Sequence, residues 1–261
     1  MDNVNKTLYI PLYGKAYVSK KTLFLEDKKA EEIWDKEQFP LKGKSSSKWL
    51  AYYMGIRAAV FDDWLRRQMN SEKDVVIIHI GCGMDSRVLR VGTRNHTWYD
   101  VDFPEVIEER KRYYEETSDY HMISGDVRND EWLNCIPKTK NAIVVMEGVS
   151  MYLTREEVQA FLTSLQGHFE EVVLFMDCYT EFAAKVSKYK NPINDVGVMK
   201  VYGLNDPKVL ERKDFRFVKE HNMMPQTYID ELKGLEKIIF EKLYAGKMSK
   251  KLYRLYEYKS I

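Results

Sequence analysis

Short apolar runs recur along the chain and alternate with segments of helical pattern. The run at 75–80, Val-Val-Ile-Ile-His-Ile, is apolar at five of six positions and mostly β-branched, which is typical of a strand buried on both faces of a parallel sheet. Similar runs predict four further strands, at 97–102, 121–127, 141–148 and 172–177. Helical patterns follow several of them, so the alternation predicts an α/β fold with a doubly wound, Rossmann-like sheet.

The N-terminal part, 1–70, departs from this alternation and is predicted to form a helical cap or lid over the core, 71–261. Charged residues at 26–34 suggest a short surface helix, and 41–48 has the composition of a linker. A longer helix is expected at 49–68, because apolar residues recur there at helical spacing: Leu50, Met54, Ala58, Phe61 and Leu65. The whole chain, 1–261, is expected to be a single domain.

The C-terminal part is predicted to complete the sheet with a final antiparallel pair, because 215–221 and 252–258 both alternate between apolar and polar residues. This gives seven strands, mostly parallel, with an antiparallel last strand. The irregular segment at 179–214 is expected to cover the substrate. Helix is predicted at 227–235, and a solvated loop at 247–251.

Polar residues and glycines stand where the predicted strands end. Gly81 and Gly83 follow the first strand, where a chain must turn sharply and bring bare backbone close to a ligand. Acids end four later strands, and a doubly wound sheet gathers strand ends along one edge: Asp102, Asp126, Glu147 and Asp177. This convergence predicts a ligand site at that edge of the sheet.

Each of these features also has a plain structural interpretation. A glycine turn after a strand occurs without any ligand, and Ser86 stands where a dinucleotide site would have a third glycine. Asp102, 19 residues after Gly83, is placed to bind ribose hydroxyls, but it could instead cap the helix that Pro104 begins. Arg57, between small residues, could be a solvated helix charge.

Composition and charge narrow the class of protein. The 41 Lys and Arg residues balance 40 Asp and Glu residues, so the net charge of +1 indicates neither nucleic acid nor a membrane surface as a partner. Three distant cysteines fit a reducing compartment and exclude a disulfide framework, and the scattered histidines provide no structural metal site. Neither a signal peptide nor a membrane span is recognisable, so we expect a soluble, cytoplasmic protein.

Five motifs between Arg57 and Leu153 carry a resemblance to a known family. They are Gly55-Ile56-Arg57-Ala58-Ala59-Val60-Phe61-Asp62, Gly81-Cys82-Gly83-Met84-Asp85-Ser86-Arg87, Asp100-Val101-Asp102-Phe103-Pro104-Glu105-Val106-Ile107, Gly125-Asp126-Val127-Arg128 and Glu147-Gly148-Val149-Ser150-Met151-Tyr152-Leu153. In this order and spacing they resemble the class I S-adenosyl-L-methionine (SAM) methyltransferases. More narrowly, they resemble the leucine carboxyl methyltransferase family, which includes the tetracenomycin-type polyketide O-methyltransferases.

The resemblance implies a role for each matched position. Gly81 and Gly83 would let the backbone pack beneath the methionine part of SAM, and Arg57 would hold its carboxylate. Further contacts would come from acids and one amide at the strand ends: Asp102 to the ribose, Asp126 and the Val127 amide to the adenine, and Glu147 near the ammonium. Tyr152 would line the acceptor pocket, and Lys15 would contribute from the lid.

The resemblance further implies that the reaction is methyl transfer from SAM to an oxygen. Because SAM carries its own electrophile, the protein mainly has to orient a nucleophile. A carboxylate needs no base at pH 7, whereas a hydroxyl does. No His or Asp base is evident at the strand edge, which favours a carboxylate acceptor on a small molecule or a peptide.

Two alternatives remain open, an NAD-dependent oxidoreductase and a non-catalytic SAM-binding protein. The first shares the glycine turn and Asp102 but explains neither Asp126 nor Glu147. The sequence indicates no oligomeric state.

Overall fold

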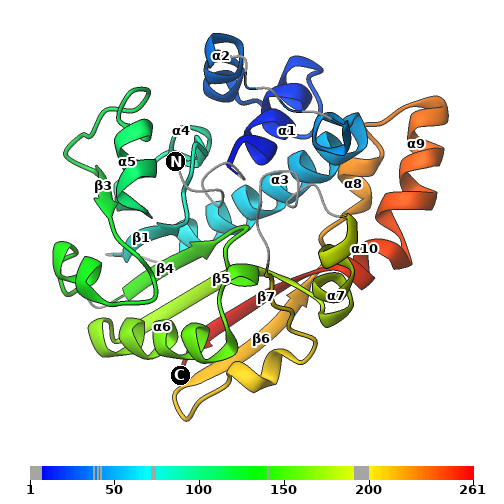
Figure 1. Ribbon diagram of the computed structural model, residues 1–261. Coiled ribbons are helices and arrows are strands. Elements are labelled where there is room, and N and C mark those ends of the chain that lie inside the picture. Colours follow the sequence, from blue (N-terminus) through cyan, green and yellow to red (C-terminus); the bar gives the residue numbers. More distant parts are fainter. Residues whose placement is uncertain are drawn as a thin grey trace.

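The computed structural model describes residues 8–37, 39, 41, 43–71, 75–139, 141–190 and 200–261. Seven strands form one sheet in the order β3-β2-β1-β4-β5-β7-β6 (Figure 1). They are β1 (Val75–Ile80), β2 (Thr97–Asp102), β3 (Tyr120–Ser124), β4 (Asn141–Met146), β5 (Glu171–Tyr179), β6 (Phe215–His221) and β7 (Tyr253–Ser260). Strands β1 to β5 pair in parallel, and β7 pairs antiparallel with both β5 and β6. The prediction of a doubly wound sheet with an antiparallel last strand is confirmed.

Helices cover both faces of this sheet. The α-helices are α1 (Tyr9–Lys20), α2 (Lys28–Glu37), α3 (Lys48–Ser71), α4 (Arg87–Val91), α5 (Pro104–Arg110), α6 (Arg155–His168), α7 (Glu181–Lys190), α8 (Gln226–Ile229), α9 (Gly234–Phe240) and α10 (Lys247–Leu252). Shorter helical turns are η2 (Gly43–Ser46), η3 (Glu131–Cys135), η4 (Ser150–Tyr152), η6 (Pro207–Leu210) and η7 (Glu241–Ala245). None of the helices within the described ranges has the length and apolarity needed to cross a bilayer.

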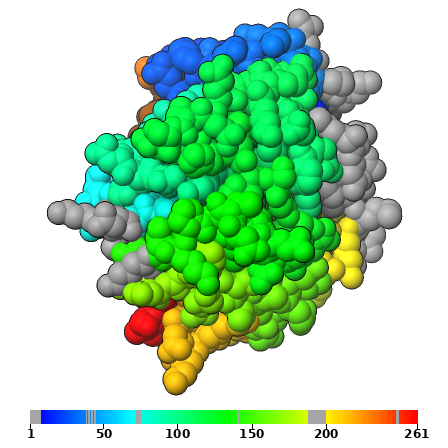
Figure 2. Space-filling model, turned by 90° about the vertical axis from the view of Figure 1, so that its left-hand side faces the viewer, coloured from blue at the N-terminus to red at the C-terminus, as the bar shows by residue number. Residues whose placement is uncertain are grey.

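Alternate residues of the strands supply two separate cores, one on each face of the sheet. Ile77 of β1 packs with α1, α3 and α5, whereas Ile78 faces the other way and packs with α6. Phe175 of β5 fixes α3 on the first face, since its ring lies 4.5 Å from that of Phe61 and 4.7 Å from that of Trp64. Figure 2 shows the N-terminal helices resting directly on the part of the core that contains α5 and β3.

The sequence predicts a helical cap at 1–70 but no bounds for helix α1, because apolar and charged residues are mixed along it and Gly14 lowers helix propensity. Tertiary packing explains its formation. A Cβ on Gly14 would lie 2.7 Å from the Cβ of Met54 in α3, so only glycine permits this close approach of the two helices. Helix α3 begins and ends close to the predicted bounds, and it is buried on most of its surface rather than on one stripe.

Other predictions near the C-terminus need correction. The single helix expected at 227–235 is two helices, α8 and α9, and the loop expected at 247–251 is helix α10. The segment 179–214 contains helix α7, while 191–199 lie outside the described residues. The capping box predicted at the start of α6 is confirmed, because the Thr154 hydroxyl accepts from the Glu157 amide at 3.2 Å and the Glu157 carboxylate accepts from the Thr154 amide at 2.6 Å.

Candidate active site

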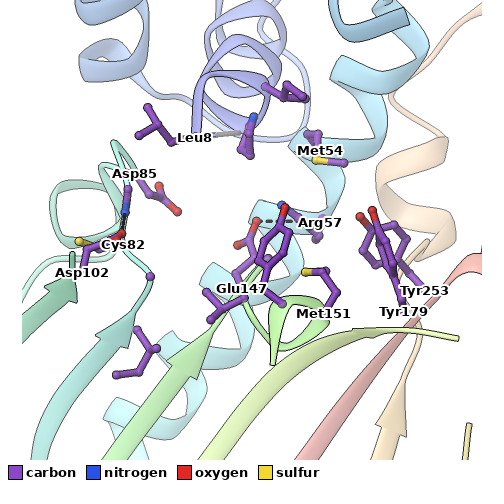
Figure 3. Close-up of a pocket in the computed structure, with 18 of the residues that line it drawn as sticks. Leu8, Met54, Arg57, Cys82, Asp85, Asp102, Glu147, Met151, Tyr179 and Tyr253 are labelled. Atoms are coloured by element: carbon purple, nitrogen blue, oxygen red, sulfur yellow. Dashed lines mark hydrogen bonds and ion pairs between the residues drawn. The ribbon is translucent and has the colours of Figure 1, made fainter. Parts of the chain in front are cut away.

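A cavity of about 1190 Å³ lies at the carboxyl ends of the parallel strands (Figure 3). The N-terminal helices α1 and α3 contribute to one side of it, and α7 and α10 contribute to another. All eight residues to which the resemblance assigns a contact with the cofactor or the acceptor line this cavity: Arg57, Gly81, Gly83, Asp102, Asp126, Val127, Glu147 and Tyr152. Lys15 of α1 lines it as well, whereas Asp177, the fourth of the converging acids, does not. The roles assigned to these residues stay predictions.

The turn after β1 requires glycine on both steric and conformational grounds. Gly81 and Gly83 have φ values of +64° and +50°, which other residues rarely adopt. A Cβ on Gly81 would lie 2.1 Å from Cγ2 of Val149, so no larger residue fits there. The bare turn therefore presents backbone directly to the cavity.

Asp102 at the end of β2 ties this turn to the neighbouring strand. Its Oδ2 accepts a 2.7 Å hydrogen bond from the Gly83 amide, and its Oδ1 accepts a 2.8 Å bond from the Phe103 amide. The predicted alternative, that Asp102 caps α5, is wrong, because the cap position is Phe103 and no side chain caps this helix. Burial raises the pKa of Asp102 to about 6, although the two backbone amides partly offset the shift.

Arg57 lies buried between two acids at the ends of β4 and β5. Its Nε donates to Glu147 and its Nη1 to Asp177, both at 2.9 Å. Arg57 is 3% exposed, so the interpretation as a solvated helix charge is wrong. Asp177 is fully buried and accepts a 2.6 Å hydrogen bond from the Gly148 amide. It does not line the cavity itself, but it supports Gly148, which does.

The two acids that flank Arg57 titrate differently. Burial raises the pKa of Asp177 to about 6 despite the attraction of Arg57. Burial would also raise the pKa of Glu147, but Arg57 and Arg87 outweigh it and hold that pKa at about 2. Glu147 is therefore the firmly ionised acid of the pair at neutral pH.

The ion pairs extend from Glu147 to a second group of charges, of which Asp62, Asp85 and Arg87 lie in the sequence motifs without an assigned role. Arg87 donates to Glu147 and, at 2.8 Å, to Asp62 of α3. Arg90 donates at 2.7 Å both to Asp62 and to Asp85 in the glycine turn. The Nζ of Lys15 lies 3.4 Å from Asp85, which brings the lid helix α1 into the same network. No period or spacing in the sequence joins these residues, which lie on α1, α3 and α4.

Asp126 lies at the outer margin of the cavity and pairs with a residue of its own loop. Arg128 donates from Nε to both carboxylate oxygens, at 2.9 and 2.8 Å. The Gly125 amide donates to the Asp102 backbone carbonyl at 2.8 Å and so joins this loop to β2. Asp102 and Asp126 therefore belong to one continuous wall of the cavity.

The other end of the cavity is aromatic. Figure 3 shows Tyr179 and Tyr253 side by side, pointing into it, on the far side of Arg57 and Glu147 from Asp102. The two tyrosines are register partners on β5 and β7, and their rings lie 4.7 Å apart. Tyr53 of α3 completes the group, with its ring 5.7 Å from that of Tyr253 and its hydroxyl 3.3 Å from that of Ser249. Burial raises the pKa of Tyr53 and of Tyr253, so both phenols stay protonated.

No role was predicted from the sequence for these three tyrosines. Tyr179 was assigned to the irregular segment after the strand predicted at 172–177, whereas β5 continues to Tyr179, and the antiparallel register that brings Tyr253 opposite is not visible in the sequence.

His79 is the one histidine that lines the cavity among the described residues, and both of its ring nitrogens are engaged. Nδ1 lies 3.1 Å from Asp100, and Nε2 lies 3.1 Å from Nη1 of Arg87. Burial lowers its pKa, so the ring is neutral at physiological pH. Its contacts are structural, and neither nitrogen is placed to take a proton from a ligand in the cavity.

A parallel sheet with an antiparallel β7, together with a glycine turn bound to the acid at the end of β2, defines the class I methyltransferase architecture. A profile of the leucine carboxyl methyltransferase family matches residues 7–166, and the chain belongs to this family. The tetracenomycin polyketide synthesis O-methyltransferase TcmP of Streptomyces glaucescens is similar, with 27% identity over 241 residues, 91% of this chain and 89% of the relative. The S-adenosyl-L-methionine-dependent methyltransferase dpfgK of Gibberella zeae is 27% identical over 183 residues, 64% of this chain and 61% of the relative.

Solved structures share the fold. A SAM-dependent methyltransferase from Anabaena variabilis matches with a TM-score of 0.55 and 13% identity, over 89% of this chain and 93% of that one. Magnesium protoporphyrin IX methyltransferase from Synechocystis, solved with S-adenosylhomocysteine, matches with a TM-score of 0.51 and 13% identity, over 88% of this chain and 93% of that one. The family confirms the predicted class of enzyme, a SAM-dependent methyltransferase, and contradicts the NAD-dependent oxidoreductase. Membership also favours an enzyme over a non-catalytic SAM-binding protein.

Proposed function

We propose that this protein transfers the methyl group of SAM to a carboxylate oxygen of a small, largely apolar acid. The observation that carries the proposal is the division of one cavity into a charged end and an aromatic end that lacks a base among the described residues. The cavity volume of about 1190 Å³ exceeds the roughly 300–1,000 Å³ of a typical single-ligand site, so it has room for a cofactor and an acceptor together.

The charged end suits the polar groups of SAM. The turn at Gly81 approaches the cavity as bare backbone, which fits close packing against a ligand. Asp102 uses one lone pair of each oxygen on a backbone amide and keeps the others for ribose hydroxyls. We assign the adenine to Asp126 and the Val127 amide, with Arg128 moving from the carboxylate as the ring enters.

Arg57 and Lys15 are the cations placed to hold the SAM carboxylate, and Glu147 is the acid placed to meet its ammonium. Because Nε and Nη1 of Arg57 already bind acids, the ligand would take Nη2, which lies beside Gly148, another residue of the cavity lining. Lys15 would supply the second contact from α1, which closes over the ligand. The bound cofactor supplies a methyl group on a positively charged sulfur.

The aromatic end suits an apolar acid. Met54, Met151 and three tyrosine rings line it, and aromatic groups pack well on such walls. The phenols of Tyr53 and Tyr253 stay protonated, so they can donate hydrogen bonds to a carboxylate but cannot remove a proton from a hydroxyl. An acceptor that is already ionised at pH 7 meets this environment without a catalytic base.

The test is an assay with SAM carrying a labelled methyl group, offered aromatic carboxylic acids, the matching phenols and a peptide that ends in leucine. We expect label in the aromatic acids, released as methanol by mild alkali, because esters hydrolyse and ethers do not. Alkali-stable product from the phenols would contradict the carboxylate, and labelling of the peptide alone would contradict the small-molecule acceptor.

A further inference from the structure

Exposed apolar side chains gather on one side of the molecule. Of nine large hydrophobic side chains that are exposed among the described residues, six lie on α7 or on α9 and the turn η7 that follows it: Phe182, Val186, Leu235, Ile238, Ile239 and Leu243. Figure 1 places α7, α9 and α10 together at one side of the molecule, near the end at which β7 begins. We call these six residues the apolar ridge.

The ridge is a helical face that the core does not use. Leu235, Ile238 and Ile239 stand at spacings of three and four residues, and Leu243 continues the row one turn later. Leu235 is 75% exposed and Leu243 is 60% exposed. The buried face of the same helix is marked by Phe240, which is fully buried with its ring 6.0 Å from that of Tyr52. Within the part of the chain that the structure describes, no element packs over the ridge.

Lysines surround the ridge. Five exposed lysines on α7 and on 233–251 take part in no ion pair among the described residues: Lys185, Lys233, Lys242, Lys250 and Lys251. The acids of the same elements are fewer: Glu236 pairs with Lys48 at 2.5 Å, Lys237 is shared by Asp230 at 2.7 Å and Glu241 at 4.0 Å, and Glu181 and Glu231 form no ion pair among the described residues. The overall charge of +1 thus conceals a local positive excess.

The ridge is continuous with the cavity. Val186 and Leu243 belong both to the ridge and to the cavity lining, where they stand at the aromatic end with Tyr244 and Leu252. An acceptor that reaches the aromatic end of the cavity from this side would therefore pass beside the ridge and its lysines.

We propose that the ridge docks on an anionic lipid surface, so that a lipophilic acid passes from the bilayer into the aromatic end of the cavity. Apolar residues on a helix flanked by lysines are the pattern of an interfacial helix, in which the apolar face enters the headgroup boundary. A second copy of the chain fits less well, because a two-fold contact would bring the same lysines together. Docking rests on this surface alone, and only the supply of the acceptor rests on the proposed function. The docking proposal departs from the expectation, drawn from the net charge, that no membrane surface is a partner.

The test uses the full chain with sedimenting vesicles of phosphatidylcholine, with and without phosphatidylglycerol. We expect binding to the anionic vesicles, weakened by salt. Lys233→Gln and Lys242→Gln should each lower the partition coefficient about fivefold, since a lysine near an anionic surface contributes about 1 kcal/mol. Leu235→Asp should abolish binding, and it should leave the fold intact because the side chain is exposed.

Matched controls lie elsewhere on the surface. Leu89→Asp changes a leucine that is 58% exposed on α4, and Lys213→Gln removes an exposed lysine before β6; neither should alter binding. Equal binding to neutral vesicles, no binding at all, or equal loss in the controls would overturn docking. So would a concentration-dependent dimer that Leu235→Asp dissociates. Methyl transfer to a water-soluble aromatic acid without vesicles is the separate readout, because it tests the proposed function and not docking.

Discussion

The Gly83 amide donates a 2.7 Å hydrogen bond to Oδ2 of Asp102, and this bond joins the turn after β1 to the end of β2. The acid that would bind the ribose is therefore also a support of the turn that would pack beneath the methionine part. Ligand binding and local structure are coupled through one carboxylate.

Asp102→Asn should lower both SAM affinity and the stability of the ligand-free protein. The asparagine can keep one amide bond, but its NH₂ group would face the other backbone donor, which costs about 1 kcal/mol. Loss of the charged acceptor should weaken SAM by about 1.5–3 kcal/mol, some ten- to hundredfold. Titration calorimetry and denaturant unfolding measure the two effects, with the exposed Asp119→Asn as control. Unchanged SAM affinity in the folded variant would remove the ribose contact.

SAM affinity should fall as the pH is lowered through about 6. Burial raises the pKa of Asp102 to about 6, so the ligand-free protein takes up a proton there and loses an acceptor for the ribose. Between pH 7 and pH 5 we expect roughly a tenfold loss. The free energy of unfolding of the ligand-free protein, compared with that of Asp102→Asn, should rise over the same fall in pH. The reason is that the raised pKa makes the folded state bind the proton more tightly than the unfolded state does. Calorimetry at several pH values checks this, and a pH profile that persists in Asp102→Asn would assign it to Asp177 instead.

Replacing Arg57 separates a ligand contact from a structural ion pair. Arg57→Ala leaves Asp177 buried without an ion-pair partner among the described residues, whereas Glu147 keeps Arg87; the loss should cost about 3–5 kcal/mol of stability, which would obscure any effect on binding. Arg57→Lys keeps the charge and should remain folded, with SAM affinity reduced about tenfold or more. The decisive measurement repeats the titration with decarboxylated SAM. If Arg57 holds the carboxylate, the wild type and Arg57→Lys should bind that analogue equally; a difference that persists contradicts the contact.

Tyr253→Phe should impair use of the acceptor and spare the cofactor. The phenol lies at the aromatic end, so its loss should lower kcat/KM for the acid acceptor about tenfold, the value of one hydrogen bond to a charged group, while the Kd of SAM stays constant. Tyr256→Phe is the matched control on the same strand, because its hydroxyl bonds to the Asn205 carbonyl at 3.2 Å, outside the cavity. Equal effects of the two substitutions would argue for general loosening of β7.

The two glycines of the turn should differ in their tolerance of alanine. Gly81→Ala combines a positive φ with a 2.1 Å approach to Val149, so we expect severe destabilisation and loss of SAM binding. Gly83→Ala has only the φ penalty of about 1 kcal/mol, because its nearest neighbour, the Cβ of Leu8, would be 3.5 Å away. Adding Val149→Ala to Gly81→Ala should restore part of the stability. A thermal-unfolding series shows whether it does, and no recovery would contradict the steric explanation.

The sequence alone determined the sheet, the turn and the residues that gather at its edge. Strand periodicity is local, and parallel strands end at one edge of the sheet, so Gly81, Asp102 and Glu147 could be placed along that edge from the sequence. The motifs from Arg57 to Leu153 carried the family, and the match to residues 7–166 confirms it.

Only the tertiary structure decided the connections made across long separations. Arg57 could be a solvated charge or a ligand contact in the sequence, and packing of α3 over β4 and β5 made it the buried partner of Glu147 and Asp177. Tyr179 meets Tyr253 through antiparallel register, which depends on how distant strands pair. The lysines near Leu235 look unremarkable within a balanced composition, because charge becomes a surface property only when folding segregates it.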